Sequence, residues 1–490
     1  MTLDPRTPVL VGVGVDHRSV DGSAGATPLE LMLDAARDAG VDAGASSLLT
    51  RLDSVAVTEG NWSYADPARA LATALGSREA RTVRVDIGVP QQTPVSDALR
   101  RIRSGASDVV MVVGGEAMAS RLAAERAGGV APADSTLSGF DGEPDERWQA
   151  AGEFMAPAEI AAGIWKPVEQ YACIDVARAA TAGWSAAEHD ADIAALWSAF
   201  DAVAAANPLA DFAGARPPSF FSTPSPANRP LASPYNKWHV TQWSVDQAAA
   251  LLLCSASAAE ESGVPRDRWV FPRVALESST SVSLSRRADV DRWPAMRVLG
   301  SAAAAHLGRP LGEVEFVECY SCFPVAVRVQ QIELGLPVDG VPTVTGGMPF
   351  AGGPFNSFTF QATAAVVERL RAAPDALGMV TTVSGLLTKP GLMIWGASPG
   401  PDELVADLGD EAAAATGTLE STDDATGAAV VVTGTATYQG MDRVGGFVLA
   451  DLADGRRWIG TTTDAALLDA IEARSAVGQP VQVLGRECVA

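Results

Sequence analysis

Cysteine is scarce in this sequence, and its scarcity excludes one class of fold. The chain has 490 residues and only five cysteines, which are Cys173, Cys254, Cys319, Cys322 and Cys488. An odd, widely spaced set does not build the disulfide framework of a small secreted domain, so reduced thiols and a cytoplasmic location are expected. The cysteines and histidines also lack the spacing of a zinc site, so no metal is predicted.

Long apolar runs and positive charge are scarce as well. No stretch approaches the roughly 18 apolar residues of a membrane-spanning helix, and the first residues do not form a signal peptide. There are 36 Lys and Arg against 59 Asp and Glu, which gives a formal net charge of −23. An acidic field of this size repels phosphate, so nucleic-acid binding is not expected. No complete dinucleotide-binding or P-loop glycine motif occurs.

Strand and helix patterns alternate over most of the chain. Residues 8–15, 83–89 and 108–113 are apolar, β-branched runs typical of buried strands. Residues 27–40 and 96–103 have the apolar spacing of helices. Alternation of this kind predicts a layered α/β fold, in a chain long enough for several domains.

The pattern changes twice along the chain. Residues from about 117 to 243 are rich in Ala, Pro, Trp and acidic side chains, which indicates a large insertion with helices and long loops. Residues 399–428 have little periodicity and are predicted to be a linker. Residues 429–490 contain short strands, a hairpin signal and one helix, which predicts a small OB-like β-barrel.

Two glycine-containing blocks resemble characteristic blocks of thiolases. The first, residues 102–120, contains Ser-Gly-Ala-Ser-Asp and Gly-Gly-Glu-Ala-Met, and the second, residues 344–357, resembles the Gly-Gly…Gly-His-Pro loop. Residues 319–324 are more similar to the sterol-carrier-type thiolases and to actinobacterial thiolase-like proteins with an extra C-terminal domain. The resemblance implies a duplicated five-layered αβαβα fold, with an N-terminal half at 1–255 that includes the insertion and a C-terminal half at 256–398.

The reacting residues that the family carries are missing. The position of the nucleophilic Cys falls on Gly88, the loop His falls on Gly353, and the second Cys falls on Val383, two residues before a retained Gly385. Thiolase chemistry needs a thiolate nucleophile, a base and a second proton carrier. The resemblance therefore implies an acetyl-CoA acetyltransferase scaffold that binds acyl-CoA but lacks the standard Cys/His/Cys reaction.

Tyr320 and Cys322 are the remaining candidates for chemistry. Tyr320 stands where the family's Asn-Glu-Ala-Phe block has Asn, and Cys322 precedes a predicted helix at about 325–334. A thiolate at a helix N-terminus is expected to have a lowered pKa. Steroid side-chain retro-aldolases resemble thiolases, use a Tyr in this block and work with a partner that carries an OB-like domain. Their second Tyr would fall on Gly353, so the pair of tyrosines is incomplete here. The alternative to a reactive role for Cys319 and Cys322 is that both are small buried residues.

The resemblance also implies where an acyl-CoA would bind. We expect His239 to line its pocket and the glycine loops to approach it closely, although tight turns explain glycines equally well; these glycines are Gly346, Gly347, Gly352, Gly353 and Gly385. Coenzyme A would then be a substrate or ligand, and no cofactor is expected to be tightly bound. Two alternatives remain open: a carbon–carbon lyase that acts on acyl-CoA through Tyr320, and a non-catalytic lipid-binding or interaction subunit. A homodimer, or a partner subunit of a lipid or sterol pathway, is consistent with either.

Overall fold

Two mixed β-sheets form the framework of the protein, whose computed structural model describes residues 3–18, 21, 23, 25–131, 142–400 and 402–490. The strand order is β1-β8-β4-β2-β3-β5 in the first sheet and β10-β11-β12-β9-β13 in the second. The first sheet contains β1 (Pro8–Arg18), β2 (Ser54–Thr58), β3 (Arg81–Val85), β4 (Val109–Ala117), β5 (Glu146–Trp148) and β8 (Asp246–Ser255). The second contains β9 (Phe271–Glu277), β10 (Phe316–Glu318), β11 (Leu377–Ser384), β12 (Lys389–Gly396) and β13 (Leu404–Asp407).

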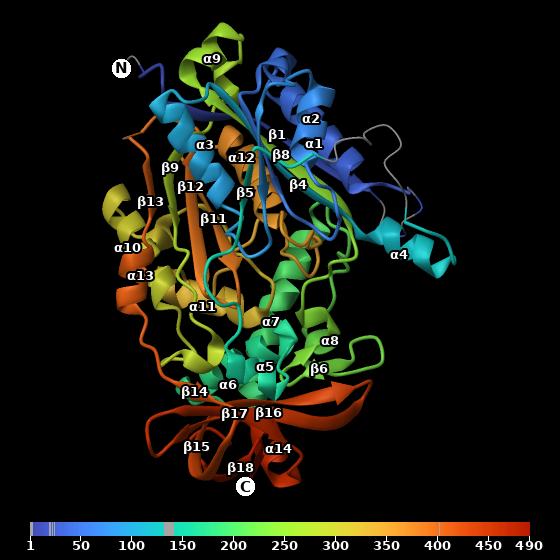
Figure 1. Ribbon diagram of the computed structural model, residues 1–490, viewed down its shortest axis with the longest axis vertical. Helices are drawn as coiled ribbons and strands as arrows, with labels where there is room; N and C mark the ends of the chain where they lie inside the picture. Colours follow the sequence, from blue (N-terminus) through green and yellow to red (C-terminus); the bar gives the residue numbers. More distant parts are fainter. Residues whose placement is uncertain (1–2, 19–20, 22, 24, 132–141, 401) are drawn as a thin grey trace.

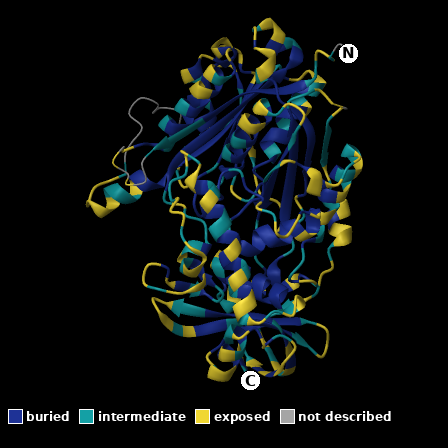
Figure 2. Cartoon of the chain, turned by 180° about the vertical axis from the view of Figure 1, so that it is seen from behind, coloured by how far each residue is buried: buried dark blue, intermediate teal, exposed yellow. Residues whose placement is uncertain are grey.

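The central strands are buried on both faces, as their unbroken apolar runs predict. All nine residues of β4 and all ten of β8 are buried, and Figure 2 shows the sheet strands in dark blue. β4 pairs antiparallel with β8 and parallel with β2, so the sheet is mixed. Strands that are apolar on both sides need a helical layer on each face.

Helices supply these layers and make the fold five layers deep. α3 (Thr93–Ser104) and α12 (Phe358–Ala372) each contact strands of both sheets and therefore form the central layer. α1 (Pro28–Asp42) and α2 (Pro67–Leu75) cover the outer face of the first sheet, and α10 (Pro294–Leu307) covers the second. Two further helices of this part are α9 (Ala256–Glu261) and α11 (Pro324–Leu334). The predicted duplicated αβαβα architecture is confirmed.

Residues 157–236 of the predicted insertion lie between the sheets and the C-terminal domain, whereas residues 118–126 project from the side of the first sheet (Figure 1). Its elements are α4 (Met118–Arg126), α5 (Pro157–Ala162), α6 (Pro167–Thr181), α7 (Ala186–Ala205), α8 (Pro218–Ser222), β6 (Pro230–Ala232) and β7 (Tyr235–Asn236). Short 3₁₀ segments elsewhere are Ser46–Arg51, Lys237–His239, Arg266–Arg268, Leu284–Arg286 and Leu311–Glu313. α6 packs on β15 of the C-terminal domain, and β6 pairs with the same strand. The insertion therefore connects the two parts of the molecule.

The C-terminal domain is a closed five-stranded barrel. Its strands are β15 (Ala425–Gln439), β16 (Asp442–Leu452), β17 (Arg457–Thr462), β18 (Pro480–Gly485) and β19 (Glu487–Val489), with α14 (Ala465–Glu472) before β18. Pairing runs β15–β16–β17–β19–β18 and returns to β15. Five strands in a closed ring form a small barrel of the OB type, with β6 and β14 paired to its strands from outside, and the predicted OB-like domain is confirmed.

The stretch expected to be a linker, residues 399–428, forms regular structure instead. β13 pairs with β9, α13 (Gly409–Ala415) follows it, and β14 (Ser421–Thr422) pairs with β17. The first barrel strand begins at Ala425 rather than at residue 429. Segments this short are too brief to show a hydrophobic period. They form because strands elsewhere in the chain supply their hydrogen bonds.

One strand of the insertion covers the outer edge of the first sheet. β5 pairs in parallel with β3 and is held there by ion pairs, with 2.6 Å between Arg81 and Glu146 and 2.9 Å between Arg147 and Asp86. A short, charged edge strand is a poor template for pairing with another chain. Separately, no described helix is long and apolar enough to cross a membrane.

Candidate functional site

Tyr320 lies in the turn between β10 and α11, and polar contacts hold it there. Its backbone N–H donates to Thr381 Oγ1 at 2.8 Å, and its carbonyl accepts from Gln330 Nε2 at 2.8 Å. Its phenol oxygen accepts from Gln91 Nε2 at 3.4 Å, and Gln91 Oε1 in turn accepts from the Thr359 N–H at 3.0 Å. The phenol therefore has one orientation, set by residues from three separate segments.

Burial dominates the protonation of the side chains in this turn. It raises the pKa of Tyr320 above its usual value and raises the pKa of Cys322 to about 12. The expected low-pKa thiolate at the start of α11 is therefore wrong, because the loss of hydration outweighs the helix end. Tyr320 is a proton donor at neutral pH and not a base. Cys319 and Cys322 are both free thiols.

Two residues that the sequence did not single out extend this centre. Tyr171 of α6 interacts with Cys322, where it acts against the rise in the pKa of the thiol, and stacks on Phe323 with ring centroids 4.2 Å apart. The Arg287 guanidinium acts electrostatically on Tyr171, and its Nη1 finds no hydrogen-bond partner among the described residues. Burial lowers the pKa of Arg287 to about 10. Neither residue belongs to a recognisable motif, so only the fold brings them to Cys322.

The backbone conformation at the position of the family's nucleophile favours glycine. Gly88 has φ +95°, and a Cβ on it would lie 2.9 Å from the Ala150 side chain. The Lys389 ammonium donates to the carbonyl oxygens of Gly88 at 3.0 Å and of Ala151 at 2.6 Å. Burial lowers the pKa of Lys389. This lysine ties the loop at Gly88 to residue Ala151, and both Gly88 and Lys389 line a cavity of about 170 Å³.

A side chain of the insertion fills the position of the loop histidine. A Cβ on Gly353 would overlap the Thr241 Cγ2 methyl group, and the Gly353 N–H donates to the Gln242 carbonyl at 2.9 Å. Thr241 also donates from its N–H to the Cys322 carbonyl at 3.2 Å. A segment of the insertion therefore runs between the glycine loop and α11, in the space that a histidine side chain would need.

The other expected glycines approach protein rather than open space. A Cβ on Gly346 would overlap Ala204 of α7, and one on Gly347 would lie 2.6 Å from the Phe200 ring. Gly352 faces the Gln247 side chain, and Gly385 faces the Thr388 side chain. Close packing and a positive φ, between +65° and +103° at all four, explain why these positions are glycine.

His239 is buried and fully hydrogen-bonded. Its Nδ1 accepts from the Asn236 N–H at 3.1 Å, so its Nε2 donates to the Phe221 carbonyl at 3.0 Å. Burial lowers its pKa to about 4, which keeps the ring neutral. It lines a cavity of about 180 Å³ beside the barrel, together with Arg474. The connection to the Tyr320 turn runs through Tyr235, whose ring centroid lies 5.7 Å from that of Phe323.

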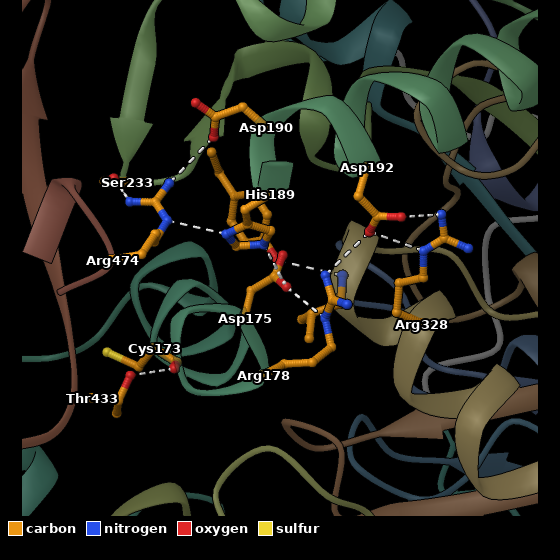
Figure 3. Close-up of polar contacts among 12 residues, drawn as sticks. Cys173, Asp175, Arg178, His189, Asp190, Asp192, Ser233, Arg328, Thr433 and Arg474 are labelled. Atoms are coloured by element: carbon orange, nitrogen blue, oxygen red, sulfur yellow. Dashed lines mark hydrogen bonds and ion pairs between the residues drawn. The ribbon is translucent and has the colours of Figure 1, made fainter. Parts of the chain in front are cut away.

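A buried ionic network fixes the barrel to the insertion (Figure 3). Arg474 donates from Nε to His189 Nδ1 at 3.1 Å, and His189 Nε2 lies 3.0 Å from Asp175 Oδ1. Asp175 also accepts from Arg178 at 2.9 Å and from the Tyr235 hydroxyl at 2.7 Å. Each charge in the network has an opposite partner, which buried charges require. Separately, the described residues contain no group of three side chains suited to a metal ion.

Comparison with known proteins gives the same fold. No family model matches the sequence, and no curated protein matches it. A monomeric SCP2-thiolase-like protein type 1 from Mycobacterium smegmatis is 27% identical, with a TM-score of 0.83 over 100% of this chain and 99% of that one. The Ltp2–ChsH2(DUF35) aldolase is 17% identical, with a TM-score of 0.60 over 81% and 99%. An acetyl-CoA acetyltransferase from Syntrophomonas wolfei is 16% identical, with a TM-score of 0.56 over 80% and 99%.

Proposed function

The chain is a member of the thiolase superfamily, and from that premise we propose that it binds an acyl-CoA without carrying out the Cys/His/Cys reaction of thiolases. The observation that carries the proposal is the packing at Gly353, where Thr241 fills the place of a catalytic side chain. Side chains that have taken over this space would have to move before a base could act there. The fold and the site, rather than the fold alone, support this assignment.

The insertion has two arginines that could hold a phosphate group of coenzyme A, and they differ in their contacts. Arg216 is an obvious cation for a phosphate, yet it pairs with the buried Asp201 at 3.1 Å and lies 4.0 Å over the Trp238 ring. Arg229 is exposed on the same insertion. A phosphate group would therefore be held by Arg229 and other exposed cations, with Arg216 as a structural residue.

The test is a calorimetric titration of the whole chain with CoA, acetyl-CoA and a long-chain acyl-CoA, with thiol release followed in the same samples. The proposal predicts binding without thiol release. Thiol release that disappears in Tyr320→Phe or Cys322→Ala would establish an enzyme instead. If none of the three ligands binds, the acyl-CoA proposal fails and an interaction subunit is favoured.

A second candidate, a carbon–carbon lyase, is favoured by one observation. The Tyr320 phenol is buried, oriented by Gln91 and protonated at neutral pH, as a general acid must be. The fold is also shared with a protein named as an aldolase. The barrel, which is docked in cis through the network of Figure 3, would then stand where a separate subunit stands in such complexes. Release of an aldehyde or ketone from a β-hydroxyacyl-CoA, abolished in Tyr320→Phe, would support this candidate.

A further inference from the structure

Lys389 of β12 differs from the other two lysines of the chain, Lys166 and Lys237, which are both exposed. Lys389 is 5% exposed, and its Nζ donates to the Gly88 carbonyl at 3.0 Å and to the Ala151 carbonyl at 2.6 Å. No carboxylate among the described residues forms an ion pair with it, and burial lowers its pKa. The surroundings of Lys389 therefore lack the negative charge that stabilises an ammonium ion inside a protein.

The two carbonyl acceptors match the hydrogen-bonding capacity of a neutral amine. An ammonium ion has three N–H donors, whereas a neutral amine has two donors and one lone pair. Two acceptors therefore satisfy both hydrogens of a neutral Nζ, and the lone pair takes the remaining position around the nitrogen. A lysine amine becomes a nucleophile in this form, when burial has removed it from water.

A cavity of about 170 Å³ lies against this lysine. Lys389 lines it together with Gly88 and Ala151, the two residues that supply its acceptors. Gln149 and Ser279 also line the cavity and are exposed, so the cavity opens to solvent. Because one water takes up about 30 Å³ of the liquid, the space suits a molecule of about five or six non-hydrogen atoms.

The register of β9 and β12 brings a carboxyl group to the same cavity. Gly391 is opposite Glu277, and Lys389 lies two residues before Gly391 on the same face of the sheet. Diagonal neighbours of this kind are about 7–8 Å apart, so one small molecule can contact both side chains. Glu277 accepts from Thr93 Oγ1 at 2.5 Å and lines the cavity. Burial raises the pKa of Glu277, so its carboxyl holds a proton more firmly than an exposed one.

We propose that Lys389 is a covalent binding site for a small aldehyde or ketone. The Nζ lone pair attacks the carbonyl carbon and forms a C–N bond, and the intermediate then loses water. Glu277 protonates the departing hydroxyl and recovers the proton that the nitrogen releases. Both amine hydrogens leave with the carbonyl oxygen, so the products are one imine and one water. The site does not depend on the binding of acyl-CoA, and its probes contain no coenzyme A.

The experiment labels the full chain with propanal at pH 7 in the presence of sodium cyanoborohydride, which reduces an imine to a stable secondary amine. Peptide mass spectrometry follows the adduct at each of the three lysines. Lys389 is expected to be modified at least about tenfold faster than Lys166 and Lys237, because a desolvated lysine is the stronger nucleophile near neutral pH. Modification of Lys389 at the same rate as the exposed lysines, or more slowly, would overturn the proposal.

A second aldehyde and a pair of variants test whether the cavity is the route to Lys389. The aldehyde 2-naphthaldehyde is too large for the space, so it should modify the exposed lysines and leave Lys389 unmodified. Ser279→Trp narrows the mouth and should abolish the rapid reaction of Lys389 with propanal. Ser475→Trp, the same change at an exposed position of the barrel, should leave the reaction intact. Unchanged modification of Lys389 in Ser279→Trp would refute the assignment to this cavity.

Glu277→Gln tests the proton transfer. The amide keeps an acceptor for Thr93 but has no proton to give, so the reaction of Lys389 with propanal should slow at least about tenfold. The rate at Lys237 in the same sample is the internal control and should not change. An unchanged rate at Lys389 would refute the role of Glu277.

Discussion

The Tyr320 centre and the cavity beside it lie on opposite sides of one ring, that of Phe358, and they differ in how their space is used. Around Tyr320, a side chain from a distant segment, Thr241, fills the position of the family's loop histidine. In the cavity, which lies between the end of β1, the C-terminal end of α7, residues 343–351 and α12, about 570 Å³ stays open. The comparison teaches that a scaffold can lose its reacting residues through packing while room for a ligand remains nearby.

Removing the dividing ring should have the largest effect. Phe358 is 1% exposed, so Phe358→Ala is expected to cost ~3–5 kcal/mol of unfolding free energy and to join the two spaces. Cys322 should then react faster with a thiol reagent, measured at a denaturant concentration well below unfolding. Phe360→Ala is the matched control on the same helix: it should destabilise similarly and leave the thiol rate unchanged. Equal thiol rates in both variants would contradict a dividing role.

Protonation of Glu318 should give the next largest effect. This buried carboxyl accepts from the Val344 N–H at 2.7 Å and from the Thr345 N–H at 2.9 Å, and burial raises its pKa to about 7. The folded state therefore keeps a proton that the unfolded chain releases above about pH 4.5. Stability should fall as pH rises from about 4.5 to 7, by up to ~3 kcal/mol from this group, and should stay lower above pH 7.

Denaturant unfolding across this pH range, for the native chain and for Glu318→Gln, checks the assignment. The amide is nearly isosteric with the protonated acid, so the variant should lose this part of the pH dependence and remain stable at low pH. Burial also raises the pKa of Glu116 to about 7, and Glu116→Gln is the parallel variant for separating the two contributions. A Glu318→Gln profile identical to that of the native chain would exclude Glu318 as the source.

Restoring the family's histidine should destabilise the filled centre more modestly. In Gly353→His the new side chain meets Thr241, and overpacking of this kind costs ~1–3 kcal/mol. Combining it with Thr241→Gly should recover part of the loss, because the two residues compete for one space. A double-mutant cycle in chemical unfolding measures that coupling. Full additivity of the two changes would show that the histidine position is not filled by Thr241.

The smallest expected effect is at the mouth of the cavity. Arg369 is exposed, so Arg369→Ala should change stability by no more than about 0.5 kcal/mol. Denaturant unfolding of the native chain and of the variant measures this difference. A loss of more than about 1 kcal/mol would contradict the assignment of Arg369 as a surface residue.

Much of the architecture follows from local patterns. The apolar run at 108–113 predicts the fully buried β4, and the alternating residues after 429 predict barrel strands, because these periods reflect one- or two-sided burial. The sequence patterns did not predict β13 and β19. Both strands are short, and each pairs with a strand from elsewhere in the chain.

The sequence alone determined which reacting residues are absent, since a glycine at 88 or 353 carries no side chain in any fold. It also determined that Tyr320 and Cys322 are close together. Only the tertiary structure decided what surrounds them: burial raises the pKa of Cys322, Lys389 hydrogen-bonds to the loop at Gly88, and Thr241 takes the place of a histidine. The physical reason is that hydration and contact depend on which distant segments the topology brings together, and no local period records that information.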